Sequence, residues 1–287
     1  MTSITNGNKK IIYDIGANNG DDVPYYLKKA DIVIAVEANP ILCEQMQKRF
    51  ALEIQQQKLV IENCVLTAAN EVTSVPFYIH KTKHVLSQFP APTHKPENYE
   101  KVFLPGKTVN QLFYEHGYPY YVKIDIEHYD HVILRSLLNN DIRPKYISAE
   151  SHSIEVFILL ASLGNYDAFK IVNGSSVATT YHNWPISTTT GEEVYSFPYH
   201  SAGPFGEDVA GEWVNSESLF RTLLSDGLGW KDIHAKKQDE YMLARRPSVL
   251  WRIRYWYYFL RWKISRSQCL KRIRGFLYKA SKKVIKG

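Results

Sequence analysis

The sequence predicts an α/β protein in which a mostly parallel sheet carries helices on both faces. Short apolar runs, typical of buried strands, alternate through residues 1–173 with stretches of helical periodicity. A glycine-containing turn follows the first run, at the strand end where open α/β sheets bind ligands. The length of 287 residues is enough for one large domain with additions. The composition, 45% hydrophobic and 22% charged, is that of an ordinary globular protein.

Six apolar runs are predicted as strands, with helices between them. Pro24 is tolerated in the first turn of the first helix, and Gly164 ends the last one. The second helix opens at Pro40, and its apolar side is expected to carry Ile41, Leu42, Met46 and Phe50. The predicted strands are 11–15, 32–36, 59–61, 120–124, 146–149 and 169–172, and the predicted helices are 22–30, 40–50, 109–116, 131–138 and 154–163.

Two stretches with a weaker pattern are predicted as additions to this sheet. Residues 75–79 read as an extra strand, and 81–107, which is polar and contains four prolines, reads as a loop over the site. From 174 to 235 Gly, Pro, Ser, Thr and aromatic residues dominate, with one helix near 218–224, which indicates a lid or insertion. The predicted parts are a core of 1–173, a lid or substrate-side extension of 174–244 that completes the same domain, and a basic helical tail of 245–287.

The turn after the first strand, DIGANNG, has the features of a ligand-binding loop. Gly16 can adopt a positive φ and lets a ligand approach the backbone, and Gly20 permits close packing where the next helix begins. No Lys-Ser/Thr pair follows Gly20, which disfavours a phosphate-binding P-loop, and Asn18 stands where a dinucleotide-binding turn would have its middle glycine. The acid Asp14 instead suits a positively charged ligand.

A second acid, Glu37, stands at the end of the next strand. A carboxylate at this place can accept both hydroxyls of a ribose. S-adenosylmethionine combines a ribose with an ammonium and a sulfonium group, so it fits these two acids. Asn63 and Cys64, at the end of the third strand, are expected near its adenine. The alternative is that all these residues only cap helices and form turns, as Asp, Asn and Gly often do.

Several blocks of sequence, in this order and at this spacing, resemble the FkbM-type S-adenosylmethionine-dependent methyltransferases. They are YDIGANNGD, VIAVEANP and YVKIDIEHYDHVILRSL, followed by PKYISAES, and they cover 10–155, half of the chain. The resemblance implies a Rossmann-like class I methyltransferase sheet of seven strands, six parallel and one antiparallel. It also implies O-methylation, most often of sugars, glycans or polyketide-type hydroxyls. The segments SAGPFGED and WKDIHA are similar to extensions of some members.

The resemblance further assigns residues by their position in these blocks. It implies a cofactor loop of Asp14, Gly16, Asn18 and Gly20, a ribose acid at Glu37, and a strand-end acid near the methyl group at Asp125. The family usually continues with Glu-Gly and, one residue later, Glu. Here the chain reads Glu127-His128-Tyr129-Asp130, so His128 replaces the glycine and Asp130 the acid. This departure leaves open a chain that keeps the fold without the chemistry.

Methyl transfer to a hydroxyl requires that the acceptor be positioned and that its proton be removed. The candidates for this, at the ends of the fourth and fifth strands, are Asp125, Glu127, Glu150 and His152. Lys123 shares a sheet face with Asp125, and we expect it to pair with a carboxylate such as Asp125 or Glu150. A divalent cation held by Asp125 with Glu150 or His152 is an alternative that the spacing does not favour, so no metal ligand is assigned. His152 as a helix-start residue and Asp125 as a cap are the non-catalytic alternatives.

The loop and lid regions offer weaker candidates for contacts with cofactor or acceptor. His84 and Ser87 are candidates in the long polar loop. Glu207, Asp208 and the nearby His200 are candidates for binding sugar hydroxyls. The candidate stacking platforms for a sugar ring are Tyr181, Trp184, Tyr195 and Tyr199. The alternative for these aromatic residues is a local core.

The net charge of +6 is divided unevenly along the chain. Residues 1–244 hold 21 basic and 29 acidic side chains, whereas 245–287 hold 14 basic and no acidic ones. The arginines of the helix-compatible stretch 249–264 rule out a simple membrane span. Its aromatic residues and cations fit an interfacial helix on an anionic membrane. The cations expected on one helical side are Arg254, Arg261, Arg272 and Lys279. The alternatives are a helix packed on the body and RNA binding, which no recognised motif supports.

The sequence thus predicts an S-adenosylmethionine-dependent O-methyltransferase acting on a hydroxyl of a saccharide or glycan, with lipid-linked acceptors included. Its alternatives are a methyltransferase for RNA or another non-sugar acceptor, and a non-catalytic binding module. Three scattered cysteines, Cys43, Cys64 and Cys269, fit a reducing cytoplasm, and no secretory signal is expected. We expect a cytoplasmic location, peripheral on the inner membrane face through the tail.

Overall fold

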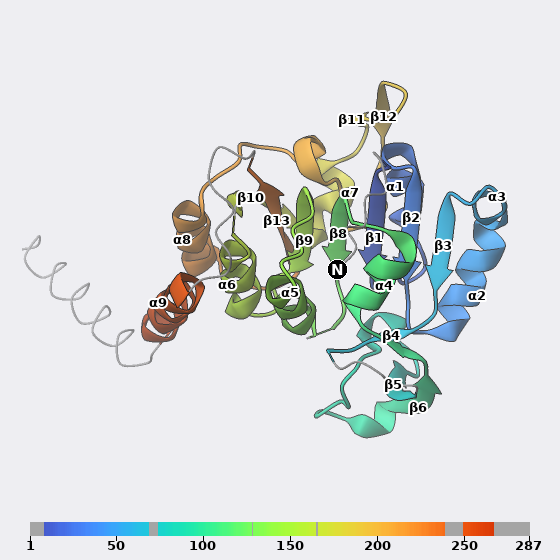
Figure 1. The fold of residues 1–287 in the computed structure, drawn as a ribbon, viewed down its shortest axis with the longest axis horizontal. Helices are drawn as coiled ribbons and strands as arrows, with labels where there is room; N and C mark the ends of the chain where they lie inside the picture. Colours follow the sequence, from blue (N-terminus) through green and yellow to red (C-terminus); the bar gives the residue numbers. More distant parts are fainter. Residues whose placement is uncertain (1–8, 69–73, 128, 165, 239–248, 267–287) are drawn as a thin grey trace, which may run out of the picture.

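The protein, seen in a computed structural model, is built around one seven-stranded sheet (Figure 1). The structure describes residues 9–68, 74–127, 129–164, 166–238 and 249–266. The sheet strands are β1 Ile11–Ile15, β2 Ile32–Val36, β3 Leu59–Glu62, β8 Tyr121–Ile124, β9 Tyr146–Glu150, β10 Tyr166–Asn173 and β13 Lys231–Lys237. Their order is β10-β13-β9-β8-β1-β2-β3, and β13 alone runs antiparallel to the other six strands. This confirms the predicted class I methyltransferase sheet.

Both faces of the sheet are buried, which explains why its strands read as nearly continuous apolar runs. In β1, Ile11, Tyr13 and Ile15 contribute to one core and Ile12 to the other. The first core is covered by α4 (Val109–His116), α5 (Asp130–Asn139), α6 (Ile154–Ser162) and α8 (Ser216–Asp226). The second is covered by α1 (Val23–Lys29), α2 (Pro40–Arg49) and the chain around α7 (Val177–Thr180).

Helix α2 begins where its sequence predicts, and its neighbour α3 (Ala51–Gln55) follows directly. The Asn39 side chain caps α2 by accepting a hydrogen bond from the Ile41 amide. Met46 and Phe50 are buried as predicted, together with Leu42, but the prediction for Ile41 is wrong because half of its side chain is exposed. At about 100° per residue Ile41 lies well away from the arc that the other three share.

The prediction that 81–107 is a loop is wrong in part. The segment contains β6 (Tyr99–Leu104) and β7 (Gly106–Lys107). β6 pairs antiparallel with β5 (Val75–His80), the predicted extra strand, and β7 pairs parallel with β4 (Val65–Leu66). Much of β6 is exposed, so its sequence lacks the apolar signal of a buried strand. Figure 1 shows this small unit below the carboxyl ends of the main strands.

The region predicted as a lid or insertion supplies a strand of the main sheet. β13 lies between β9 and β10, and a short hairpin of β11 (Trp184–Ser187) and β12 (Glu192–Tyr195) precedes it in the chain. The sequence of β13, KDIHAKK, does not show the apolar pattern of a buried strand, because Asp232 and His234 are polar although they are buried. The predicted helix near 218–224 is present as α8.

The last described element is α9 (Val249–Arg266), which agrees with the helix predicted from 249 to 264. It packs against α6. Arg272, Lys279 and Cys269 lie outside the described residues. Within the described part of the chain, no helix has both the length and the apolar character needed to cross a membrane.

Candidate active site

A cavity of about 390 Å³ lies at the carboxyl ends of the central strands. Its volume falls within the usual range for small-molecule sites. The small unit of β5 and the residues after it closes one side of the cavity through Phe77, Gln88 and Phe89. The predicted residues that line it are Gly16, Asn18, Glu37, Cys64, His84, Ser87, Asp125, Glu127, Glu150 and His200.

The turn after β1 can be built only with glycine at its first position. Gly16 has a φ of +83°, and an added Cβ would lie 1.9 Å from the carbonyl oxygen of Asp125. The Gly16 amide donates to the carbonyl oxygen of Val36 at 2.9 Å, which ties the turn to β2. Asn18 also has a positive φ, of 49°. The turn therefore brings bare backbone to the cavity wall.

Glu37 is held in place by the same turn. Its Oε2 accepts a hydrogen bond from the Asn18 amide at 2.8 Å, and its Oε1 accepts one from the Asn39 amide at 2.7 Å. Burial raises the pKa of Glu37 to about 7, although these two bonds favour the ionised form. The carboxyl is thus fixed at the cavity and ionises near neutral pH.

Asn63 and Cys64, both predicted near an adenine, have different positions. Cys64 lines the cavity, whereas Asn63 is not among the lining residues. The Asn63 amide donates to the carbonyl oxygens of Glu37 and Ala38, at 2.9 Å each. Asn63 therefore supports the end of β2 from behind.

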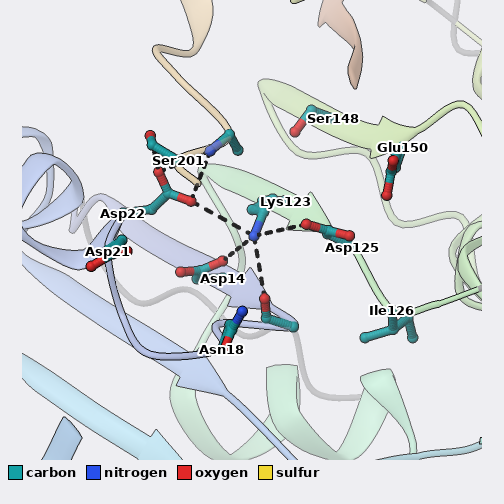
Figure 2. A network of polar contacts seen from close by, with 12 residues as sticks. Asp14, Asn18, Asp21, Asp22, Lys123, Asp125, Ile126, Ser148, Glu150 and Ser201 are labelled. Atoms are coloured by element: carbon teal, nitrogen blue, oxygen red, sulfur yellow. Dashed lines mark hydrogen bonds and ion pairs between the residues drawn. The ribbon is translucent and has the colours of Figure 1, made fainter. Parts of the chain in front are cut away.

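Lys123 is the centre of a buried ionic network (Figure 2). Its Nζ lies 3.2 Å from Oδ1 of Asp14, 3.4 Å from Oδ2 of Asp125 and 3.7 Å from Oδ2 of Asp22, and it donates to the carbonyl oxygen of Gly16 at 3.3 Å. The predicted pairing with Asp125 is thus present. Burial alone would lower the pKa of Lys123, but the surrounding carboxylates raise it well above its usual value.

Two of the carboxylates around Lys123 lie deeper than the cavity wall. Asp14 is fully buried and is not a lining residue, and burial raises its pKa. Asp22, which the sequence analysis missed, accepts hydrogen bonds from the Ser201 hydroxyl and the Ala202 amide. Burial raises the pKa of Asp22 to about 6. The only sequence signal for Asp22 was its place at the start of a helix.

Asp232 of β13 is a further missed acid. It lies opposite Glu150 in the sheet register and is buried. Burial raises the pKa of Asp232 well above its usual value, and the nearby charge of Asp125 adds to this effect. The carboxyl groups gathered around Lys123 are therefore Asp14, Asp22, Asp125 and Asp232, and Glu150 lies next to Asp232. This surplus of acid favours a positively charged ligand. Burial favours the protonated form of these carboxyl groups, and a nearby positive charge would stabilise their ionised form.

Glu150 and His152 form an ion pair at the end of β9. Oε2 of Glu150 lies 2.8 Å from Nε2 of His152. Burial opposes protonation of His152, but its hydrogen bond to Glu150 and the charge of that carboxylate raise its pKa to about 9. Ligand atoms of these two residues and of Asp125 lie within 4.8 Å of one another, which is the set considered above for a divalent cation.

The segment that departs from the family pattern contributes two cavity residues. Glu127 and Tyr129 line the cavity, and burial raises the pKa of Glu127 to about 7. Asp130 is buried at the start of α5, where it accepts a hydrogen bond from the Ile126 amide at 3.1 Å. Asp130 therefore stabilises the turn. His128 lies outside the described residues.

Trp230 and His200 form an aromatic wall of the cavity. Their ring centroids are 6.4 Å apart with an interplanar angle of 31°, and Trp230 is 42% exposed. The indole lies against Gly174, where an added Cβ would be 2.3 Å from its Nε1. Trp230 opens the segment WKDIHA, which was noted as an extension, but the residue itself was missed.

The other lid candidates do not line the cavity. Tyr181, Trp184 and Tyr195 pack with Phe197 in a local core, as the alternative for them proposed, and Tyr199 lies beside Trp230. Asp208 is buried and interacts with Lys29 and Tyr25. Glu207 interacts with Lys236, Tyr146 and Trp213. The segment SAGPFGED is core, because Phe205 stacks on Tyr121 with centroids 4.0 Å apart.

In solved structures, the chain is similar to a methyltransferase FkbM from Methylobacillus flagellatus KT, at 11% identity and a TM-score of 0.39, over 57% of this chain and 40% of that chain. It is similar to a precorrin-6y C5,15-methyltransferase from Geobacter metallireducens GS-15, at 12% identity and a TM-score of 0.35, over 80% of each chain. A third is StiE O-MT residues 961–1257, at 10% identity and a TM-score of 0.39, over 86% of this chain and 72% of that one.

Among curated proteins, none matches the chain. Residues 14–171 match the Methyltransferase FkbM domain family, which is more than half of the sequence. The chain therefore belongs to this family of methyltransferases.

Proposed function

We propose that this member of the FkbM family is an S-adenosylmethionine-dependent O-methyltransferase whose acceptor is a hydroxyl of a saccharide or glycan. The family supplies the methyl transfer and implies the cofactor. Support for the acceptor class comes from one cavity that combines carboxyl groups with the exposed indole of Trp230.

The residues of the turn fit the cofactor. Gly16 presents backbone that no larger residue could present, and Glu37 is oriented to accept the two ribose hydroxyls. The acidic surplus around Lys123 suits an ammonium and a sulfonium group. When bound, S-adenosylmethionine supplies a methyl group that is already activated on a positively charged sulfur.

Glu127 is the side chain that we assign to take the acceptor proton. Its carboxyl lines the cavity and has a pKa of about 7, which is close to the value a general base needs near neutral pH. Glu150 also lines the cavity, but its Oε2 is paired with His152, which is protonated at neutral pH because its pKa is about 9. The Glu150–His152 pair thus orients the acceptor rather than removing its proton.

The aromatic wall is the observation that carries the saccharide assignment. A sugar ring has an apolar face that can stack on an indole and hydroxyl edges that carboxylates can bind. Trp230 and Glu127 line the same cavity, so one ring could contact both.

The experiment is mass spectrometry of a panel of saccharides, glycans and RNA after incubation with the protein and the cofactor. We expect a gain of one methyl on a saccharide, and a Glu127→Gln variant with kcat lowered by about 10²-fold or more. A matched control is Glu193→Gln, whose partly exposed carboxylate pairs with Lys28 and does not line the cavity. Methylation of RNA alone, or full activity of Glu127→Gln, would contradict the proposal.

A further inference from the structure

Helix α9 packs one face on the body of the protein and leaves an apolar face in solvent. Tyr258 is 5% exposed and belongs to the core shared with α6 and α8, and Phe259 and Trp262 pack beside it. On the opposite face, five large side chains are each at least half exposed. They are Ile253 at 60%, Trp256 at 56%, Tyr257 at 50%, Leu260 at 50% and Ile264 at 55%, and we call them the α9 stripe.

The α9 stripe is continuous along the helix and has a cation at each edge. At about 100° per residue, the five side chains fall within an arc of about 100°. Arg261 lies beyond one edge of this arc and Lys263 beyond the other. Arg261 is bound to Glu217 at 3.1 Å, and the exposed Lys263 has its ammonium 4.8 Å from the centroid of the Phe259 ring.

The charge of the surrounding sequence has a single sign. Residues 245–287 contain 14 Lys and Arg and no acidic residue, and seven of these cations fall in 267–287, beyond the described helix. A surface that matches this segment must offer many negative charges next to an apolar layer that covers the stripe. Nucleic acid offers phosphates but no hydrocarbon for Ile253, Leu260 and Ile264. An anionic bilayer offers both, and Trp and Tyr are enriched at its headgroup level.

We propose that the α9 stripe and the basic residues of 245–287 bind the protein to an anionic membrane surface. The apolar side chains enter the boundary between headgroups and acyl chains, and the cations bind lipid phosphates. The helix lies in the plane of the membrane, because only one of its faces is apolar and exposed.

The position of α9 gives this binding a consequence for the active site. Trp262, Lys263 and Arg266, near the end of the helix, line a hollow together with His152. His152 is paired with Glu150, which lines the cavity. Membrane binding through α9 therefore brings the side of the protein that carries the Glu150–His152 pair toward the lipid surface, where a lipid-linked acceptor would be found.

The test is co-sedimentation of the full chain with vesicles, made either from equal parts of phosphatidylglycerol and phosphatidylcholine or from phosphatidylcholine alone. We expect binding to the anionic vesicles that weakens with salt. The triple variant Ile253→Ser/Leu260→Ser/Ile264→Ser should lower the partition coefficient by about tenfold or more. The matched control is Phe103→Ser/Tyr114→Ser/Val194→Ser, which removes three exposed apolar side chains elsewhere and should bind like the wild type.

Several outcomes would overturn the proposal. They are equal pelleting of wild type and triple variant, equal binding to neutral vesicles, and RNA binding or self-association that depends on the α9 stripe in the absence of vesicle binding. A second measurement covers the case in which the triple variant fails to fold. Vesicles with brominated phosphatidylglycerol should quench the tryptophan fluorescence of the wild type more than that of Trp256→Phe, and equal quenching would reject the proposed contact. Cofactor affinity, measured by calorimetry, should be unchanged in Trp256→Phe and in the control, so that failure of membrane binding is distinguished from failure of the proposed enzyme activity.

Discussion

The two halves of the cavity differ in how they are built. The half formed by β1, β2 and β8 depends on short-range features, namely a glycine turn, a strand-end acid and a buried lysine. The half formed by His200 and Trp230 comes from a region more than 20 residues beyond β10, and Trp230 is positioned at the cavity because the following residues enter the sheet as β13. The first half can be recognised from local sequence, whereas the second requires the topology.

The largest test of this difference is Lys123→Met in the first half. The change leaves Asp14 and Asp22 buried without their cation, so we expect the free energy of unfolding to fall by about 3–5 kcal/mol. The Lys123 ammonium lowers the pKa values of Asp14 and Asp22, so its removal raises them further. The native variant then holds more protons than the native wild type, and the loss of unfolding free energy should grow as pH rises from about 5 to about 8. Chemical denaturation at several pH values measures this.

The control for this change is Lys28→Met, which removes a partly exposed pair with Glu193 and should cost about 1 kcal/mol or less. Similar losses for both lysines would show that the buried network does not distinguish this half of the cavity.

Gly16→Ala is the next largest change. The added Cβ would meet the carbonyl oxygen of Asp125 at 1.9 Å, so we expect a loss of about 3 kcal/mol in unfolding free energy and weaker cofactor binding. Gly211→Ala isolates the effect of backbone strain, because Gly211 has a φ of +78° and no atom within 4 Å of its added Cβ. This control should lose only about 1 kcal/mol. Thermal unfolding and calorimetry with S-adenosylmethionine measure both variants, and equal losses would contradict a steric role for Gly16.

Glu37→Gln separates the two halves by function. We expect cofactor affinity to fall by about 10-fold to 100-fold, with the KM for the acceptor unchanged. In the wild type, affinity should increase as pH rises through about 7, because Glu37 must lose its proton to accept two hydroxyls. The stability of the free protein has the opposite trend. The folded pKa of about 7 exceeds the ordinary glutamate value of 4.5, so stability falls as pH rises between these values. The measurement is calorimetry with the cofactor at several pH values. If the cofactor affinity of the wild type were as independent of pH as that of Glu37→Gln, the role of the Glu37 carboxylate would be contradicted.

Trp230→Ala is the smallest predicted effect and completes the comparison. We expect the acceptor KM to rise by about tenfold and cofactor affinity to stay the same, because one stacking contact is lost. Trp230→Phe should recover most of the loss. Tyr199→Ala, which removes an exposed ring beside Trp230 but outside the cavity lining, is the control. A change in cofactor affinity without a change in the acceptor KM would show that Trp230 contacts the cofactor rather than the acceptor.

The fold was predictable wherever local rules determine it. The strand at Ile32–Val36 and the helix at Val109–His116 have the bounds that their apolar patterns predict. β13 was not predictable from pattern, because its buried Asp232 and His234 read as exposed positions. In the site, Glu37 was identifiable as an acid at a strand end. Trp230 lacked such a signal, since its role depends on which loop the topology brings to the cavity.

The place of β13 between β9 and β10 has a consequence for how the molecule is assembled. Both neighbouring strands precede it in the chain by many residues, so the sheet keeps an open slot until 231–237 has been synthesised. A chain cut after residue 173 would retain the glycine turn but lack the indole of Trp230 and the carboxyl of Asp232. The cavity wall is therefore complete only after residues 230–237 have joined the sheet, and shorter chains lack that part of the wall.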